Sequence, residues 1–487
     1  MRRISLPLGL VVSASLAAAA LVAVPTVVQA SAPQPAVAGA DATYTTTLNY
    51  LTRFYPRYLT AWLGETAPQN TFLAPTSGLD GLLTSDARTI NAFNVDTVYA
   101  SVLNMNVSKG PEILTVPQST STASLLSLDV WGTVFDTGIK VDRQAGKYAL
   151  ALAGWRGVLP PGVTRVTVPV SQFEFTIRAD RYSRSGTGYA NTVASGKTFI
   201  AGLRLASLAD YKANPDSGRP LPTPQRLITA SSKVQADDSL ANTPVRFLSD
   251  LQVAMHSAST TPLTVGDRAL SAAFDVVFAA AQRGVTNGNY GAMSQVTQAA
   301  IAVDSMIVDH YRSHLVAGTN WVNFNNLADW GTAYLDRDAT TAYIFLGNSA
   351  STSRYWDAFT DHNGHPLDTG IYPLYTMTFT KDQIPDAKRF WSLTAYVGEA
   401  LHVTPGPPNN GNRNVASYTP GLRTNKDGSI TIFIGPTPPK ILALRPNWVF
   451  VPPDTPFSMV LRTYGAQGNT APGLTYIPPQ IKALGIL

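Results

Sequence analysis

Short alternations of apolar and polar residues, broken by Gly, Pro and Asn, occupy two separate parts of the chain. In the first part, from about residue 94 to 182, they predict strands at Thr97–Leu103, Glu112–Val116, Leu125–Val134, Tyr148–Leu152, Thr164–Val168 and Glu174–Arg178. In the second part, from about 341 to 487, the clearest strands are Tyr372–Phe379, Phe390–Tyr396, Ile430–Ile434 and Ser458–Tyr464. Each part is therefore predicted to form an antiparallel sandwich or barrel.

Apolar residues at helical spacing precede and separate the two strand-rich parts. One stripe predicts a leading helix, in which Pro56 should cause a kink or a restart because proline cannot donate a backbone hydrogen bond; its members are Tyr44, Leu48, Leu51, Tyr55, Leu59 and Trp62. The chain is again helical in pattern from about 200 to 325, including 269–282 and 296–314. The predicted fold class is mainly β with helical additions, in which two β-barrel or jelly-roll-like modules are joined by a helical segment.

The first thirty residues follow the pattern of a secretory signal peptide. Arg2 and Arg3 precede an apolar run, and small residues around Ala30 provide a cleavage site. A transmembrane anchor is the competing interpretation, but Pro25 and the small-residue site favour cleavage. The predicted organisation is a signal peptide at 1–30, a lead-in at 31–41, an N-terminal module with its leading helix at 42–199, a helical connection at 200–340 and a C-terminal module at 341–487.

Composition narrows the possible functions. The chain has no cysteine, so an exported fold must be held by its core rather than by disulfides, and thiol chemistry and cysteine metal sites are excluded. The formal net charge is +5 without any run of Lys or Arg, which argues against nucleic-acid binding. Nucleophile-elbow, phosphate-loop and dinucleotide motifs are missing, so no cofactor is expected.

Two stretches resemble a known pair of families. The first, similar to domain of unknown function 1254, contains Asn94–Tyr99, Gly110-Pro111, Val116-Pro117, Trp131–Thr133, Gly154–Gly157 and Pro161-Gly162. The second, similar to its usual companion, domain of unknown function 1214, contains Asp361, Gly364–Leu367, Phe390–Thr394, Asp427–Ser429, Asn447-Trp448, Phe457 and Leu461–Tyr464.

The resemblance implies two β-barrel or jelly-roll-like modules with helices between and around them, in a commonly exported, homo-oligomeric protein. It implies no settled reaction and no agreed catalytic set. The chain also departs from the family pattern, which often has an Arg-Tyr pair where Arg413 is here followed by Asn414.

Histidine pairs are the first candidates for chemistry. His310 and His314 are four residues apart on a predicted helix and could reach one metal ion, but the helix dipole alone favours histidine there, and no third ligand is visible in the sequence. Asp361, His362 and His365 share a short span that suits proton transfer or, more weakly, metal binding. The alternative is a polar turn, for which Asp, Asn and Gly are typical.

Asn94, Asp96, Thr97 and Tyr99 form the main polar group of the N-terminal part. A carboxylate within a sheet is costly unless it is paired, and Arg178 or Arg156 could pair with Asp96. A structural ion pair is the alternative to a binding site. In the C-terminal part, Arg413, Arg462 and Tyr464 could line a polar pocket.

These observations lead to one main hypothesis and two alternatives. The main hypothesis is a secreted or envelope-associated protein that binds an uncharged extracellular or cell-wall-derived molecule in a barrel mouth, with or without cleaving or modifying it. The catalytic candidates are Asp361, His365, Arg413 and Arg462, and the substrate-binding candidates are Asn94, Asp96, Tyr99 and Tyr464.

The alternatives are a non-catalytic envelope scaffold and a metal-dependent hydrolase that uses His362 and His365 with Asp361. The expected partner is a small molecule or an envelope polymer, without nucleic acid and without a membrane span once the signal is removed.

Overall fold

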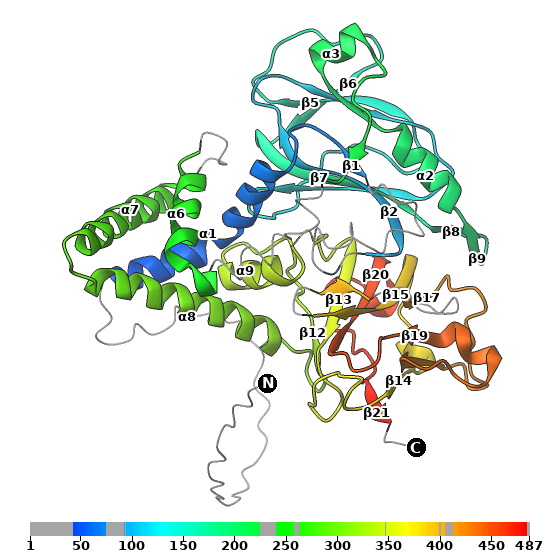
Figure 1. Cartoon of the computed structure of the whole chain (residues 1–487). Coiled ribbons are helices and arrows are strands. Elements are labelled where there is room, and N and C mark those ends of the chain that lie inside the picture. The colour runs from blue at the N-terminus through cyan, green and yellow to red at the C-terminus, as the bar shows by residue number, and fades with distance from the viewer. Residues whose placement is uncertain are drawn as a thin grey trace, which may run out of the picture. The chain divides into compact units, whose positions relative to one another are not determined.

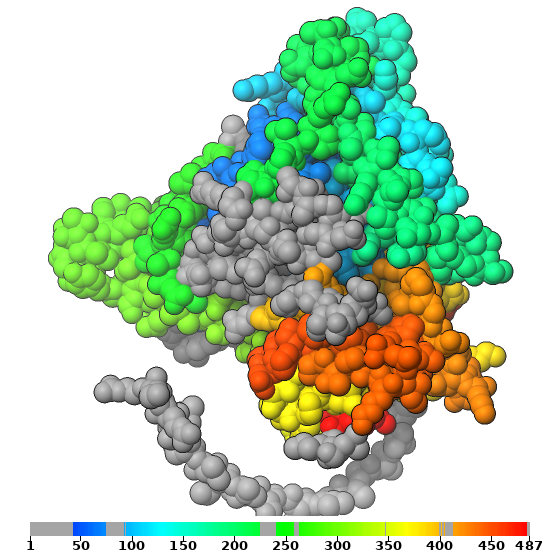
Figure 2. Space-filling view, turned by 45° about the vertical axis from the view of Figure 1, so that its right-hand side comes forward, coloured from blue at the N-terminus to red at the C-terminus, as the bar shows by residue number. Residues whose placement is uncertain are grey.

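The computed structural model describes residues 42–74, 92, 94–224, 240–257, 263–345, 347–398, 401–404 and 413–484, without the side chains of residues 402 and 403. Other residues are grey in Figures 1 and 2. The predicted signal peptide and lead-in lie outside the described residues. In the described ranges, no helix combines the length and the apolar character that a membrane span needs.

Two sheets build the N-terminal module (Figure 1). The five-stranded sheet has the order β11-β1-β2-β7-β4, with β11 Leu221–Pro222, β1 Leu73–Ala74, β2 Thr97–Asn106, β7 Gln172–Asp180 and β4 Ala123–Asp129. The four-stranded sheet has the order β10-β3-β5-β6, with β10 Arg204–Ser207, β3 Glu112–Val116, β5 Gly146–Leu152 and β6 Thr164–Val168. Side chains of both sheets share one core, where Val102 and Phe175 join Leu114 and Leu150.

The C-terminal module also consists of two sheets. The larger has the order β12-β13-β20-β15-β16, with β17 beside β15; the strands are β12 Trp321–Val322, β13 Ser353–Ala358, β20 Phe457–Ala466, β15 Ala387–Val397, β16 His402–Val403 and β17 Asn414–Ala416. The smaller has the order β19-β18-β14-β21, with β19 Trp448–Phe450, β18 Ile430–Gly435, β14 Leu374–Phe379 and β21 Lys482–Leu484. Trp356 and Leu461 of the larger sheet pack in one cluster with Tyr375 and Ile432 of the smaller.

The predicted strands agree closely with those observed. β3 and β6 match residue for residue, and most of the others begin or end within a few residues of the prediction. The mainly β class with helical additions is confirmed. The described strands form open sheets, so no closed barrel is seen among them. β10 and β11, which follow residue 199, pair back with β3 and β1 of the N-terminal sheets.

Helices pack around the leading helix α1, Ala42–Thr66, which contacts α6, Pro244–Met255; α7, Val265–Thr286; α8, Gly291–Ser313; and α9, Tyr334–Tyr343 (Figure 1). The predicted restart at Pro56 is wrong, because α1 continues through this residue. Proline inside a helix costs about 3 kcal/mol, but the surrounding residues are buried and Tyr58 stacks on Phe247 with 3.9 Å between ring centroids. Tertiary packing therefore holds the helix together at this point.

Smaller elements complete the described chain. They are the hairpin β8 Tyr182–Ser185 and β9 Gly188–Asn191, the helices α2 Val193–Gly202 and α3 Leu208–Ala213, and the short 3-10 helices η2 Lys381–Gln383, η4 Leu442–Asn447 and η5 Gly468–Thr470. The hairpin contributes to the contact between the modules, because the hydroxyls of Tyr189 and Ser417 are 2.8 Å apart.

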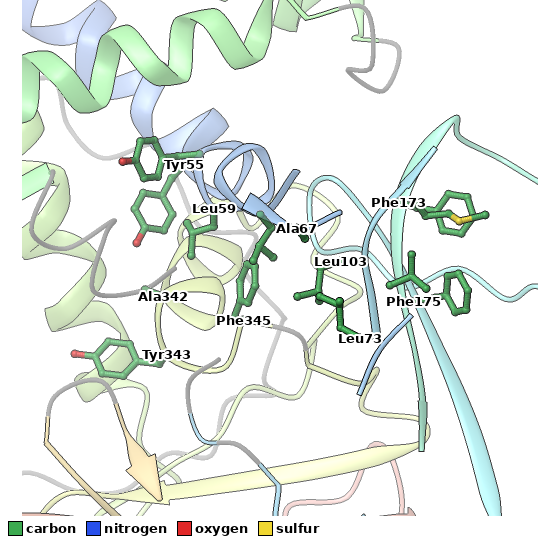
Figure 3. Packing of buried hydrophobic residues seen from close by; sticks show 14 of the residues in the cluster. Tyr55, Leu59, Ala67, Leu73, Leu103, Phe173, Phe175, Ala342, Tyr343 and Phe345 are labelled. Carbon is green, nitrogen blue, oxygen red and sulfur yellow. The ribbon is translucent and has the colours of Figure 1, made fainter. Parts of the chain in front are cut away.

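One hydrophobic cluster extends through α1, the N-terminal sheets, the helices and part of the C-terminal module. Figure 3 shows Leu59 of α1, Leu103 of β2, Phe175 of β7 and Phe345, which follows α9, within this cluster. Val460 of β20 belongs to the same cluster. The five-stranded sheet and the six-stranded sheet are therefore connected through a continuous core, next to which their polar residues meet.

Candidate functional site

Polar side chains of the five-stranded and six-stranded sheets meet in a buried group, which we call the tyrosine–arginine cluster. Every member is at most 9% exposed. The cluster consists of Asn94, Asp96, Tyr99, Arg178, Tyr355, Tyr396, Arg462 and Tyr464. Such a concentration of buried polar groups is uncommon, because polar groups lose their hydration when they are buried.

Strand register places a tyrosine opposite an arginine in each of the two sheets. Tyr99 of β2 lies opposite Arg178 of β7, and the guanidinium carbon is 5.5 Å from the ring centroid. Tyr355 of β13 lies opposite Arg462 of β20 at 5.9 Å. Tyr464 is two residues beyond Arg462 and so emerges on the same face of β20. Each sheet thus contributes an arginine above an aromatic ring, a favourable cation–π arrangement.

Asp96 is fully buried and accepts hydrogen bonds from three neutral donors of the C-terminal module. Ser392 Oγ donates to one carboxylate oxygen at 2.7 Å, while Asn414 Nδ2 at 2.6 Å and the Tyr418 hydroxyl at 2.5 Å donate to the other. Burial raises the pKa of Asp96, although the bonds from Tyr418 and Ser392 oppose the shift. The group is therefore easier to protonate than an ordinary aspartate.

The predicted pairing of Asp96 with Arg178 or Arg156 is wrong. Its direct partners are the three neutral donors, and Arg156 is exposed and donates to the carbonyl oxygen of Ala153. The sequence alone could not show these partners, because all three donors come from the C-terminal part of the chain. Asn414, which stands where the resembling family often has a tyrosine, binds Asp96 directly.

Arg462 is held at the centre of the cluster by neutral acceptors. Its Nη1 donates to the Tyr396 hydroxyl at 2.7 Å and its Nη2 to the carbonyl oxygen of Ala92 at 2.6 Å. Ala92 has a φ of +47°, a left-handed conformation that is unfavourable for a residue with a Cβ atom.

Neither Arg178 nor Arg462 has a carboxylate within ion-pair distance among the described residues. Arg178 Nε also lacks a hydrogen-bond partner within the part of the chain that the structure describes. Arg389 on β15 provides the contrast, because its guanidinium makes two hydrogen bonds to Asp180, one of them from Nε at 3.0 Å. Arg178 is therefore a buried cation of the cluster without a carboxylate in contact, whereas Arg462 interacts at longer range with the carboxylates of Asp96 and Asp357.

The structure brings together all four predicted substrate-binding residues. Asn94 Nδ2 donates to the Tyr464 hydroxyl, the backbone amide of Asp96 donates to Asn94 Oδ1 at 2.5 Å, and Tyr99 lies near Tyr464. Among the catalytic candidates, Arg462 belongs to the cluster. Arg413 is half-buried beside it, where burial and then repulsion from Arg181 lower its pKa to about 10.

Asp361 and His365 occupy a turn instead. Asp361 Oδ1 accepts hydrogen bonds from the backbone amides of Asn363 at 2.9 Å and His365 at 3.0 Å, and the His365 side chain is half exposed. His362 uses its backbone amide to bind the carbonyl oxygen of Ile481. This geometry is that of the polar turn, in which the carboxylate organises the backbone.

Three cluster members were not proposed as site residues from the sequence: Arg178, Tyr355 and Tyr396. Arg178 was considered only as a partner for Asp96, although an arginine between Ile177 and Ala179 in an otherwise apolar strand was a usable signal. Tyr355 and Tyr396 carry no comparable signal, because tyrosines in strands usually lie in cores.

Comparisons with known proteins match the chain to two families. Residues 76–198 match the family described as "Protein of unknown function (DUF1254)", and residues 352–468 match "Protein of unknown function (DUF1214)". Among curated proteins, none matches the chain.

Two solved structures are similar in fold. The VPA0106 protein from Vibrio parahaemolyticus is 17% identical with a TM-score of 0.54, and the match covers 91% of this chain and all of that one. An uncharacterized protein from Burkholderia cenocepacia is 12% identical with a TM-score of 0.41, and the match covers 91% and 94% of the two chains. The Vibrio protein shows that this fold occurs in a solved structure.

Proposed function

Because the chain joins a DUF1254 domain to a DUF1214 domain, two families of unknown function, we propose its function from the tyrosine–arginine cluster. The protein binds a small molecule, or a group of a cell-envelope polymer, that carries an acidic group. The observation on which the proposal depends is the presence of two buried arginines without a carboxylate partner among the described residues.

The energetics of burial support this proposal. Burying a charge without an ion-pair partner costs several kcal/mol, and burial opposes the charged form of Arg178 and Arg462, although the surrounding tyrosines and, for Arg462, Asp96 oppose this effect on the pKa. A carboxylate or phosphate would recover that cost, because a guanidinium forms paired hydrogen bonds with either group. The surrounding tyrosines add hydroxyl donors: burial is the first cause that raises the pKa of Tyr99 and Tyr464, so both remain protonated at neutral pH.

The proposal changes two features of the hypothesis based on sequence. An acidic ligand replaces the uncharged one, because Arg178 and Arg462 are both buried and lack a carboxylate partner among the described residues. The ligand site lies between sheets of the two modules instead of in a barrel mouth. We assign no reaction to the site. The metal-dependent hydrolase gains no support, because Asp361 uses one oxygen to organise its own turn.

A non-catalytic scaffold remains the second candidate, favoured by the contacts that join the modules. Asp180 of β7 binds Arg389 of β15, and Asn94 binds Tyr464. For either function we propose that the protein works outside the cytoplasm, in solution or at the envelope, as the predicted signal peptide indicates.

Two arginine substitutions distinguish binding from scaffolding. Arg178→Met removes an unpaired charge while keeping an apolar side chain, so we expect the free energy of unfolding to stay the same or rise. Arg389→Met leaves Asp180 buried and unpaired, so we expect a loss of about 3–5 kcal/mol. Chemical denaturation of both variants and of Arg156→Met, an exposed control, measures these differences. Equal losses in the first two variants would assign Arg178 to the scaffold.

Ligand binding is measured on the same proteins. The mature protein is screened by thermal shift and calorimetry against carboxylates, phosphate esters and sugar acids, with neutral sugars for comparison. We expect an acidic compound to bind the wild type and to bind Arg178→Met at least tenfold more weakly, with Arg156→Met unchanged. Binding of neutral sugars alone, or equal affinity in Arg178→Met, would refute the proposal.

A further inference from the structure

Outside the tyrosine–arginine cluster, three potential metal ligands converge where α8 ends near α9. His310 and His314 come from α8 and its C-terminal cap, and Asp336 comes from the first turn of α9. One ligand atom from each lies within 4.8 Å of the other two. The sequence showed only the histidine pair, and the fold supplies the carboxylate that the pair lacked.

Helix geometry explains how the group forms. His310 and His314 are one turn apart and therefore share a face of the helix. α8 packs against α9, which brings Asp336 Oδ1 to 2.6 Å from His310 Nε2. The His314 ring stacks on Phe324 with 4.1 Å between centroids and an interplanar angle of 11°. This stacking fixes the plane in which His314 presents its nitrogen atoms.

A further side chain orients the carboxylate. Asn326 Nδ2 donates a hydrogen bond to Asp336 Oδ2 at 2.7 Å, while the other carboxylate oxygen, Oδ1, contacts His310. Metal ligands are commonly oriented by such outer hydrogen bonds. The side chains of His310 and Asp336 are 28% and 18% exposed, so water can reach the group.

We propose that His310, His314 and Asp336 bind one divalent transition-metal ion of the zinc class, with water in the remaining coordination positions. Two imidazoles and one carboxylate suit zinc and its neighbours, whereas Mg²⁺ and Ca²⁺ prefer oxygen ligands alone. Neighbouring ligand atoms around tetrahedral zinc are about 3.3 Å apart. His310 and Asp336, whose ligand atoms are 2.6 Å apart, therefore need to separate by less than 1 Å, while the ligand atom of His314, within 4.8 Å of the other two, needs to approach them by up to about 1.5 Å.

Once bound, the ion ties the C-terminal end of α8 to the start of α9. This site shares no residue with the tyrosine–arginine cluster, so the two proposals stand or fall separately.

Zinc titration of the metal-free mature protein tests the site. Calorimetry should give one Zn²⁺ per chain, and Co²⁺ should give the visible absorption of a site with nitrogen and oxygen ligands. His314→Gln and Asp336→Asn should each weaken Zn²⁺ binding at least tenfold. The matched control is His256→Gln. His256 also contacts an aspartate, Asp275, at 3.0 Å, but among the described residues it belongs to no group of three potential metal ligands.

Stability measurements separate metal binding from a simple ion pair. Zn²⁺ should raise the melting temperature of the wild type and of His256→Gln but not that of His314→Gln, whose circular dichroism should match the wild type. Absence of saturable Zn²⁺ binding would show that the group is only a histidine–aspartate contact between helices. Unchanged affinity in His314→Gln would place any bound zinc elsewhere, and either result overturns the proposal.

Discussion

Glu174 should make the stability of the protein fall as the pH rises. This residue lies on β7, fully buried, and neither carboxylate oxygen has a hydrogen-bond partner among the described residues. Burial raises its pKa from 4.5 to about 8, although the charge of Arg57 opposes the shift. In the folded protein Glu174 is therefore protonated at neutral pH, while in the unfolded chain it is ionised.

The sign and size of the effect follow from this difference. Because the folded state holds the proton more tightly, the contribution of Glu174 to stability is complete below about pH 4.5 and is lost as the pH rises to about 8. One unit of pKa shift corresponds to about 1.4 kcal/mol, so the loss is about 4–5 kcal/mol. Glu174→Gln has nearly the same shape and no charge, which removes this dependence.

Chemical denaturation at a series of pH values measures the prediction. The free energy of unfolding of Glu174→Gln minus that of the wild type should increase between about pH 5 and about pH 8 by several kcal/mol. Taking the difference cancels the other titrating groups. Glu65→Gln, at an exposed position near the end of α1, serves as the control for replacing a glutamate by glutamine.

A difference for Glu174→Gln that does not change with pH would refute the reasoning. A difference that falls with rising pH would do so more strongly, because it would mean that Glu174 is ionised and paired with Arg57 in the folded protein. Arg57 is the cation of that alternative pair, and burial lowers the pKa of Arg57 to about 10.

Two further predictions concern a glycine and the signal peptide. Gly218→Ala should destabilise the protein by clearly more than Gly162→Ala. Both residues have a φ of +76°, which costs about 1–2 kcal/mol for alanine, but only at Gly218 would the new Cβ meet the carbonyl oxygen of Leu205, at 1.8 Å. Equal losses of stability in thermal unfolding would contradict this prediction. Expression of the chain with residues 1–30 in an exporting bacterial host should yield a mature protein that begins at Ser31, and N-terminal sequencing that starts at Met1 would contradict cleavage after Ala30.

Local patterns predicted the strands well because alternation and turn residues act within a few positions. Thr164–Val168 needs no distant information, as the exact match of β6 shows. The continuity of α1 through Pro56 was not predictable, since it depends on packing against residues such as Phe247, far away in the chain. Local rules therefore identify elements, while long-range packing decides how they are modified.

The candidate site shows the same division. Asn94, Tyr99 and Tyr464 could be named from the sequence because polar residues stand out in strands, but their meeting depends on how the sheets face each other. The donors to Asp96 come from β15, β17 and the residues after β17. Asp336 likewise joins the histidine pair only through the packing of α8 on α9.

The charged contacts across the two sheets have a consequence for anyone who divides this protein. Asp180 is buried in the segment that matches DUF1254, residues 76–198, and its ion-pair partner Arg389 belongs to the segment that matches DUF1214, residues 352–468. Asp96 depends in the same way on Ser392 and Tyr418. A fragment cut between the two family domains would expose the surface between the sheets and leave the carboxylates of Asp180 and Asp96 without their hydrogen-bond donors. The two domains should therefore be expressed, inherited and exchanged between proteins as a single unit.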